Sequence, residues 1–169
     1  NDHLLVAQWL VDKFKLTIDD IKSYNNEAFR YACNYGHLSI VQWLVDKCNL
    51  LVADVKSNNN LALRHACGNG HLLVAQWLVN KFNLTCDDAK TSDNHAFRHA
   101  CLCGHLSVAQ WLVDKFNLTI DDVRSDNNYA FRHACSEGHL LVAQWLVDKF
   151  NLTIDDVGSD NNHAFIYAC

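Results

Sequence analysis

The chain has 169 residues, of which 50% are hydrophobic and 20% are charged, and it carries a net charge of −5. This composition is that of a folded globular protein, and no apolar run approaches the roughly 18 residues of a membrane span. The net negative charge argues against a nucleic-acid partner, because such binding depends on Lys and Arg to neutralise phosphates.

One 34-residue unit repeats along the whole chain without insertion or deletion. Self-similarity at a fixed period of this size indicates a solenoid, in which each unit packs mainly against its two neighbours. The sequence therefore predicts a single array over residues 1–169. The markers of the period are Trp9, Trp43, Trp77, Trp111 and Trp145, and Cys33, Cys67, Cys101, Cys135 and Cys169.

In chain order, the array is expected to begin with a helix over 3–15, which corresponds to the second helix of a unit. Complete helix pairs are predicted over 26–48, 60–82, 94–116 and 128–150, followed by a partial first helix over 162–169. Neither end shows the polar capping unit that keeps a solenoid soluble, and the chain contains no methionine. We therefore expect it to be a piece of a longer array.

The unit from 127 to 160 shows how each pair is built. Asn128 is a predicted N-cap, because its side chain can accept hydrogen bonds from the first turn, and Gly138 is expected to end the first helix. The second helix begins at His139 and is apolar over more than half of its circumference. Since a surface helix has a narrower apolar stripe, neighbouring units must cover this helix on several sides.

The linker over 151–160 connects one unit to the next. Thr153 followed three residues later by Asp156 resembles a capping box, which satisfies the first amides of a helix. This pattern predicts a single helical turn. Leu152 and Ile154 also alternate as in an extended strand, so an extended hairpin arm is the weaker alternative.

The segment A-C-x-x-G-H-L-x-V-A-Q-W-L-V over 134–147 resembles the ankyrin repeat, whose core reads A-A-x-x-G-H-x-x-V-V-x-x-L-L, and similar segments cover nearly the whole chain. The N-L-T-x-x-D-V-R-S-x-N linkers are similar to those of ankyrin variants from giant viruses and amoebae. The resemblance implies an all-α, ankyrin-like solenoid of stacked helix–turn–helix repeats that binds other proteins, with the Gly-His histidines bonded at the turns.

Two departures from this family's pattern concern the helix ends. The usual T-P-L-H start is absent, and another residue replaces the glycine that usually closes the second helix, namely Phe14, Cys48, Phe82, Phe116 or Phe150. We therefore expect a short helical turn in the linker in place of the family's β-hairpin.

Two patterns suggest metal or acid–base chemistry but are better explained by structure. His65, Cys67 and His71 form the best candidate zinc set, yet His65 and Cys67 point to different sides of a helix, and structural zinc needs four converging ligands. Asp19 and Asp20, with equivalents at 87–88, 121–122 and 155–156, are more typical of favourable contact with a helix N-terminus than of catalysis. We expect no metal, no cofactor and no enzymatic activity.

The five cysteines in register would lie one stacking step apart, about 8–10 Å, which exceeds the roughly 4.4–6.8 Å that a disulfide requires. We expect them to be buried and reduced, as in a cytoplasmic protein. Cys48, Cys86 and Cys103 occupy positions that other copies fill differently.

Two ladders run along the array. The tryptophans are expected to pack as core residues beneath the linkers. For the arginines we expect pairing with linker aspartates, and the alternative is a groove for an acidic partner. These arginines are Arg30, Arg64, Arg98 and Arg132.

Positions that differ between copies are expected to be free of packing and available to a partner. They lie before the first helix, at its start and between the two helices, and the resemblance implies that the first and third groups face partners. Drift after duplication explains the variation equally well. The candidate binding residues are Tyr24, Glu27, Asn34, Tyr35, Asn58, Leu61, Asn69, Ser92, His95, Leu102, Asp126, Tyr129, Ser136 and Glu137; Gly68, Cys103, Asp160 and His163 also vary.

The leading hypothesis is a scaffold that binds another protein along the repeat surface in the cytoplasm. The alternative is a structural element that associates head to tail into a superhelix or fibre. The uncapped ends suggest this alternative, because a second copy of the chain placed after Cys169 would continue the 34-residue period nearly in phase.

Overall fold

The computed structural model describes residues 2–169, apart from the side chains of Asp2, Ser159 and Asn161. All regular structure in this part of the chain is helical. The first helices are α3 (Ser23–Asn34), α6 (Ser57–Gly68), α9 (Thr91–Leu102), α12 (Ser125–Ser136) and α15 (Ser159–Ile166). The second helices are α1 (Asp2–Phe14), α4 (Leu38–Cys48), α7 (Leu72–Phe82), α10 (Leu106–Phe116) and α13 (Leu140–Phe150). The linker helices are α2 (Ile18–Ile21), α5 (Val52–Val55), α8 (Cys86–Ala89), α11 (Ile120–Val123) and α14 (Ile154–Val157).

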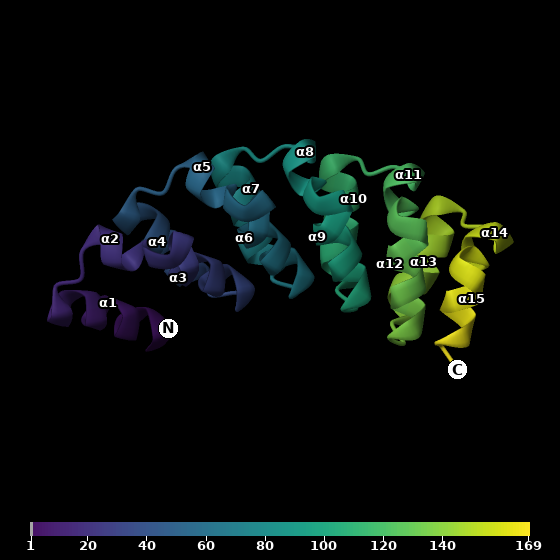
Figure 1. Cartoon of the computed structure of the whole chain (residues 1–169), viewed down its shortest axis with the longest axis horizontal. Coiled ribbons are helices and arrows are strands. Elements are labelled where there is room, and N and C mark those ends of the chain that lie inside the picture. The colour runs from purple at the N-terminus through teal and green to yellow at the C-terminus, as the bar shows by residue number, and fades with distance from the viewer. Residues whose placement is uncertain (1) are drawn as a thin grey trace.

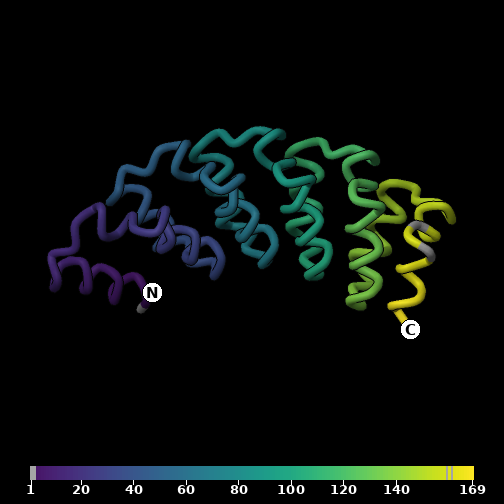
Figure 2. Tube along the Cα trace, in the orientation of Figure 1, coloured from purple at the N-terminus to yellow at the C-terminus, as the bar shows by residue number. Residues whose placement is uncertain are grey.

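The units follow one another along an arc, with the two termini at opposite ends (Figures 1 and 2). The first helices of neighbouring units pack against each other, and each of α4, α7, α10 and α13 packs on the first helix of its own unit. The linker helices α5, α8 and α11 follow one edge of the arc (Figure 1). This arrangement confirms the predicted all-α solenoid of stacked helix pairs.

The second helices carry most of the large core residues, because their apolar circumference is covered from several sides. Leu78 of α7 and Leu112 of α10 are almost fully buried, and burial of one such side chain stabilises a fold by roughly 1.5–3 kcal/mol. The tryptophans are half-buried at the edge of this core, and Trp77 meets Phe82 edge-on with ring centroids 6.1 Å apart. On α1 the equivalent Trp9 is exposed.

Glycine and histidine form the turn between the two helices of a unit. Gly70 has a φ of +79°, and the ring of His105 from the next unit lies where a Cβ would stand, with Nδ1 2.6 Å from that position. The Gly36–His71 and Gly104–His139 pairs repeat this contact. His71 also shares a hydrogen bond with the Asn34 carbonyl at 2.9 Å. These histidines therefore join neighbouring units.

A left-handed turn forms the second to fourth residues of each of α3, α6, α9 and α12 and corrects one prediction. Three successive residues there have positive φ, as in Asp126, Asn127 and Asn128 with φ between 53° and 59°. Asn and Asp tolerate this conformation better than other residues with a side chain, which explains why the second and third of these residues are Asn or Asp in all four turns. The N-cap prediction for Asn128 is wrong, because a helix cap has extended backbone and Asn128 does not.

The linker forms a short helix, as predicted, and the extended hairpin arm is absent from the described linkers. In α14, Thr153 and Asp156 make the expected capping box, with the Thr153 amide donating to Asp156 Oδ2 at 2.8 Å. The second residue of each aspartate pair makes the cap, which confirms the structural explanation of these pairs. The second helix before each of these linkers ends at an asparagine in the left-handed conformation. These asparagines are Asn49, Asn83, Asn117 and Asn151.

The capping aspartates also tie neighbouring units together. Asp88 is 8% exposed and accepts from Lys56 Nζ at 2.8 Å and from Asn60 Nδ2 at 3.5 Å, both in the preceding unit. The same links recur at Asp54, Asp122 and Asp156, whose basic partners are Lys22, Lys90 and Arg124. One carboxylate therefore caps its own linker helix and binds the linker before it.

The cysteines follow the prediction in part. All eight are free thiols, and Cys33, Cys67 and Cys101 are fully buried, where desolvation raises the pKa of each thiol. Cys135 is half-buried and Cys169 is exposed. The prediction of burial is wrong for these two residues, because fewer units of this chain pack beyond them.

Candidate protein-interaction surface

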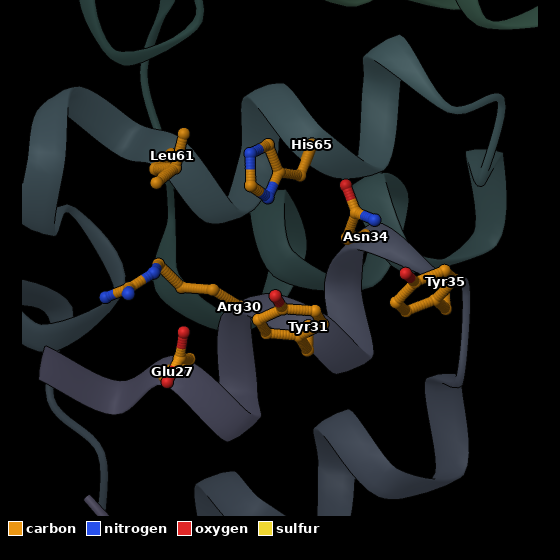
Figure 3. Close-up of a pocket in the computed structure, with 7 residues that line it drawn as sticks. All are labelled: Glu27, Arg30, Tyr31, Asn34, Tyr35, Leu61 and His65. Carbon is orange, nitrogen blue, oxygen red and sulfur yellow. The ribbon is translucent and has the colours of Figure 1, made fainter. Parts of the chain in front are cut away.

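The first helices α3 and α6 border an open hollow of about 370 Å³ (Figure 3). Tyr31 of α3 and Tyr35, which directly follows α3, are 54% and 58% exposed, so two aromatic rings are available to a ligand. Figure 3 shows Tyr31 and His65 on neighbouring helices, with Leu61 one turn before His65. The lining residues are Glu27, Arg30, Tyr31, Asn34, Tyr35, Leu61 and His65.

Helical spacing brings these side chains to one face. Glu27, Tyr31 and Tyr35 are four residues apart, and side chains at that spacing lie one above the other on a helix. Tyr31 and Tyr35 stack with ring centroids 5.9 Å apart. Leu61 and His65 occupy the equivalents of Glu27 and Tyr31 on α6, so the hollow spans two units.

The same face continues as a column of stacked and tilted rings through α9, α12 and α15. His95 and His99 stack with centroids 3.9 Å apart and an interplanar angle of 8°. Tyr129 lies 4.0 Å from His133, which lies 5.3 Å from His163. Each ring occupies one of two positions on the first helix, four residues apart. The surface is therefore aromatic along its length.

Four histidines on this face, His65, His95, His99 and His133, have lowered pKa values that favour the neutral ring. Burial, His99 and the nearby arginines lower the pKa of His95 to about 4. Burial and neighbouring positive charges also lower the pKa of His65, His99 and His133. At neutral pH these side chains offer aromatic surface and hydrogen-bonding nitrogens, because their charged forms are disfavoured.

The arginines of the first helices stabilise the left-handed turns. Arg132 donates from Nε to the Asn127 carbonyl at 2.6 Å and from Nη1 to Asp160 at 2.7 Å. Arg98 pairs in the same way with Asp126. The predicted pairing with linker aspartates is therefore confirmed for these two arginines only.

The structure separates the predicted binding residues into two kinds. Those before the first helix are exposed, as are several between the helices; these exposed residues are Tyr24, Tyr35, Asn58, Asn69, Ser92, Asp126 and Glu137, together with Glu27 at a helix start. The others are half-buried, namely Asn34, Leu61, His95, Leu102, Tyr129 and Ser136.

The prediction that variable positions are free of packing is wrong for His95, Tyr129 and Gly68. His95 and Tyr129 belong to the stacked column, and Gly68 is buried with the His99 Cβ 3.3 Å from its own Cβ position. The side chains of His95 and Tyr129 still lie on the face formed by the first helices.

The sequence analysis did not include among the binding residues the second ring position of each first helix, four residues after the position of Glu27 and its equivalents. These residues are Tyr31, His65, His99, His133 and Tyr167. They vary little between copies, so the search for variable positions passed over them. Their spacing of four from Glu27, Leu61, His95, Tyr129 and His163 was the available signal.

The candidate zinc residues do not converge. Cys67 is fully buried, His65 borders the hollow and His71 bonds to the Asn34 carbonyl. Within the described residues, no group of three His, Cys, Asp or Glu side chains is placed to hold a metal ion. None of the described helices is both long and apolar enough to cross a membrane.

The fold and this surface define a helical-repeat protein whose paired helices stack through shared turns and linkers. Residues 1–88 match the family model described as ankyrin repeats (3 copies), and the chain belongs to the ankyrin repeat family. Ankyrin repeats are generally modules for protein–protein interaction, and the family typically forms non-enzymatic scaffolds.

The chain is also similar to a solved structure, the X-ray structure of an ankyrin repeat family protein from Legionella pneumophila. The sequences are 28% identical and the TM-score is 0.59. The match covers 71% of this chain and 36% of that protein, so this chain spans just over a third of its length. The search of curated proteins found no match.

Proposed function

We propose that this chain is a scaffold that binds a partner protein along the face formed by its first helices. The observation that carries the proposal is the hollow between α3 and α6, where Tyr31 and Tyr35 are more than half exposed. Tyrosine is enriched among the residues that dominate binding energy, since its ring is large and its hydroxyl can find a partner. The reduced cysteines support a cytoplasmic setting.

Selection from a random peptide library tests this proposal without knowledge of the natural partner. Peptides selected on the wild-type chain are re-measured against Tyr35→Ala and against Leu141→Ala. Leu141 is a matched control because it is 68% exposed on α13, a second helix away from the hollow. We expect Tyr35→Ala to weaken binding by about tenfold, the usual loss when a central aromatic contact is truncated. Glu137→Ala tests the same face further along the array.

The selected peptides should bind Leu141→Ala as tightly as the wild type. If they bind Tyr35→Ala and Glu137→Ala with unchanged affinity, the first-helix face is not the binding surface. Thermal unfolding of each variant shows whether a loss of affinity comes from the contact or from the fold.

The second candidate function is head-to-tail self-association. It is favoured by the apolar side chains exposed at the two ends of this chain, among them Leu5 and Trp9 on α1 and Phe165 and Ile166 on α15. In the inner units the residue equivalent to Trp9 is half-buried by neighbouring helices. Sedimentation over a hundredfold concentration range distinguishes the two functions: association predicts a rising mass, and a constant monomer mass contradicts it.

A further inference from the structure

The ion pairs of α9 and α12 show how a carboxylate binds this surface. Arg98 pairs with Asp126, and Arg132 pairs with Asp160, so each carboxylate comes from the left-handed turn of the following unit. The two arginine side chains are 12% and 8% exposed, whereas the aspartates are 48% and 43% exposed. The guanidinium of Arg98 also lies 4.7 Å from the ring centroid of Tyr129.

The equivalent places in the N-terminal half carry no charge. Asn58 and Ser92 stand where Asp126 and Asp160 stand in the later units. Arg30 and Arg64 still donate to the turn carbonyls, Arg64 to Asn58 O at 3.1 Å and Arg30 to Tyr24 O at 3.2 Å. Among the described residues, neither arginine lies within ion-pair distance of a carboxylate.

Two exposed carboxylates lie at neighbouring positions without pairing with these arginines, one three residues before Arg30 and one directly after Ser92. Glu27 borders the same hollow as Arg30, and Asp93 follows Ser92 in the left-handed turn. Both are exposed, and neither takes part in an ion pair of the described chain. Arg30 and Arg64 are half-buried residues, and reduced screening at a partly buried site strengthens attraction to an incoming anion.

We propose that an acidic segment of the partner protein supplies the carboxylates that Asn58 and Ser92 lack, binding Arg30 and Arg64 beside the hollow. This proposal rests on the proposed function and names the chemistry of the partner. In the ion pairs of Arg98 and Arg132, the chain itself supplies the carboxylate that the partner supplies to Arg30 and Arg64. The exposed rings of Tyr31 and Tyr35 flank the segment.

The spacing of the units sets the spacing of the acidic side chains. Neighbouring packed helices are about 8–10 Å apart, and an extended peptide advances roughly 3.3 Å per residue. Two carboxylates that reach Arg30 and Arg64 are therefore about three residues apart in an extended segment. A contiguous acidic cluster is not needed.

A fluorescent peptide with two glutamates three positions apart in a neutral sequence tests this arrangement, with the glutamine version as its counterpart. Asn58→Asp places the chain's own carboxylate beside Arg30, as Asp126 does beside Arg98. Asn80→Asp is the matched control: it makes the same chemical change at an exposed site on α7, and Asp46, Asp114 and Asp148 already occupy the equivalent position. Binding is followed by fluorescence anisotropy at low and physiological salt.

We expect the wild-type chain to bind the glutamate peptide more tightly than the glutamine peptide, with a preference that shrinks as salt rises. Asn58→Asp should weaken binding of the glutamate peptide by about fivefold, the upper range for one partly exposed ion pair. Asn58→Asp combined with Ser92→Asp should weaken it by about tenfold or more. Asn80→Asp should leave it unchanged, and neither set of variants should lower the melting temperature.

Equal binding of the two peptides, or no binding of the glutamate peptide at low salt, overturns the proposal. So does an equal effect of Asn58→Asp and Asn80→Asp. Each of these results leaves the proposed function standing if library peptides still lose affinity on Tyr35→Ala. Asp126→Asn gives the reverse test: by releasing Arg98 it should tighten binding of a longer peptide with three such glutamates by a few-fold.

Discussion

At the scale of single residues, the turn glycines depend on both backbone and neighbour. Gly70 and Gly138 have almost the same φ, +79° and +74°. They differ in what surrounds them, because His105 packs on Gly70 and nothing lies within 4 Å of a Cβ at Gly138. The pair separates the cost of the left-handed backbone from the cost of a clash between units.

Gly70→Ala is expected to lower the free energy of unfolding by about 3 kcal/mol. About 1–2 kcal/mol comes from the left-handed conformation, and the rest comes from displacing the His105 ring, since overpacking typically costs about 1–3 kcal/mol. Gly138→Ala should cost only the backbone part, about 1–2 kcal/mol. Urea unfolding of the two variants measures both values, and equal losses would show that His105 moves aside freely.

The candidate surface could be predicted only in part at this scale. Variation between copies pointed to Tyr35 and Glu137, which are exposed. It also pointed to His95 and Tyr129, which are half-buried in ring stacks. A single sequence shows that a position tolerates change, but it does not show whether the change faces solvent or the neighbouring unit. The distinction between paired Arg98 and unpaired Arg30 likewise required the contact between units.

At the scale of elements, periodicity predicted the second helices and the linker helix well. Their signals are local, because an apolar stripe and a capping box each lie within one helix. The left-handed turn at the start of α3, α6, α9 and α12 was not predicted, although Asn128 was singled out. Asn favours both an N-cap and left-handed backbone. The left-handed backbone is favoured over the N-cap by a contact with the next unit, in which Asn128 Nδ2 donates to Asp156 Oδ1 at 3.4 Å.

Asp88→Ala is expected to destabilise the fold by about 2–3 kcal/mol. Loss of the cap on α8 accounts for about 1 kcal/mol. The remainder comes from the hydrogen bond to charged Lys56, since such bonds contribute about 1.5–3 kcal/mol each. Asp87→Ala is the control, because Asp87 is an exposed neighbour on the same short helix. Chemical denaturation should show a change within about 0.5 kcal/mol for the control, and a similar loss in both variants would contradict the linking role of Asp88.

At the scale of the whole molecule, the links between units make stability a property of the array. Each inner unit is joined to the next through a glycine–histidine contact, an asparagine–aspartate bond and a linker ion pair, as Gly70–His105, Asn60–Asp88 and Lys56–Asp88 illustrate. Stability in such solenoids is approximately a sum of unit and interface contributions. A pH-dependent contribution to the free energy of unfolding that occurs in every unit is therefore multiplied by the number of units.

Stability is expected to fall in two stages as pH is lowered. The pKa of His95 is lowered to about 4 by burial and nearby positive groups, so the unfolded chain takes up this proton first. A lowered folded-state pKa gives stability that is full above the unfolded value and is lost below it. The free energy of unfolding should therefore decline from about pH 6.5 downward, and His65, His99 and His133 act in the same direction.

The second stage begins below about pH 4, the range in which free aspartates take up protons. Although burial acts in the opposite direction, hydrogen bonds from Lys56 and Thr85 lower the pKa of Asp88, and the equivalent groups do so at Asp122. Bonds from the linker backbone and from Arg124 lower the pKa of Asp54 and Asp156 respectively. Because their pKa values are also lower in the folded state than in the unfolded state, the stability that these carboxylates contribute is lost as pH falls through their folded-state pKa values.

Urea unfolding at a series of pH values from 8 to 2 measures both stages, with one variant assigned to each. His95→Gln removes a titrating group of the first stage, so its curve should be flatter than that of the wild type between about pH 6.5 and 4 and parallel to it below. Asp88→Asn should do the reverse, because it removes a carboxylate that titrates only in the acid range. A wild-type free energy that stays constant between pH 7 and pH 4 would mean that the stacked histidines take up protons as easily when folded as when unfolded.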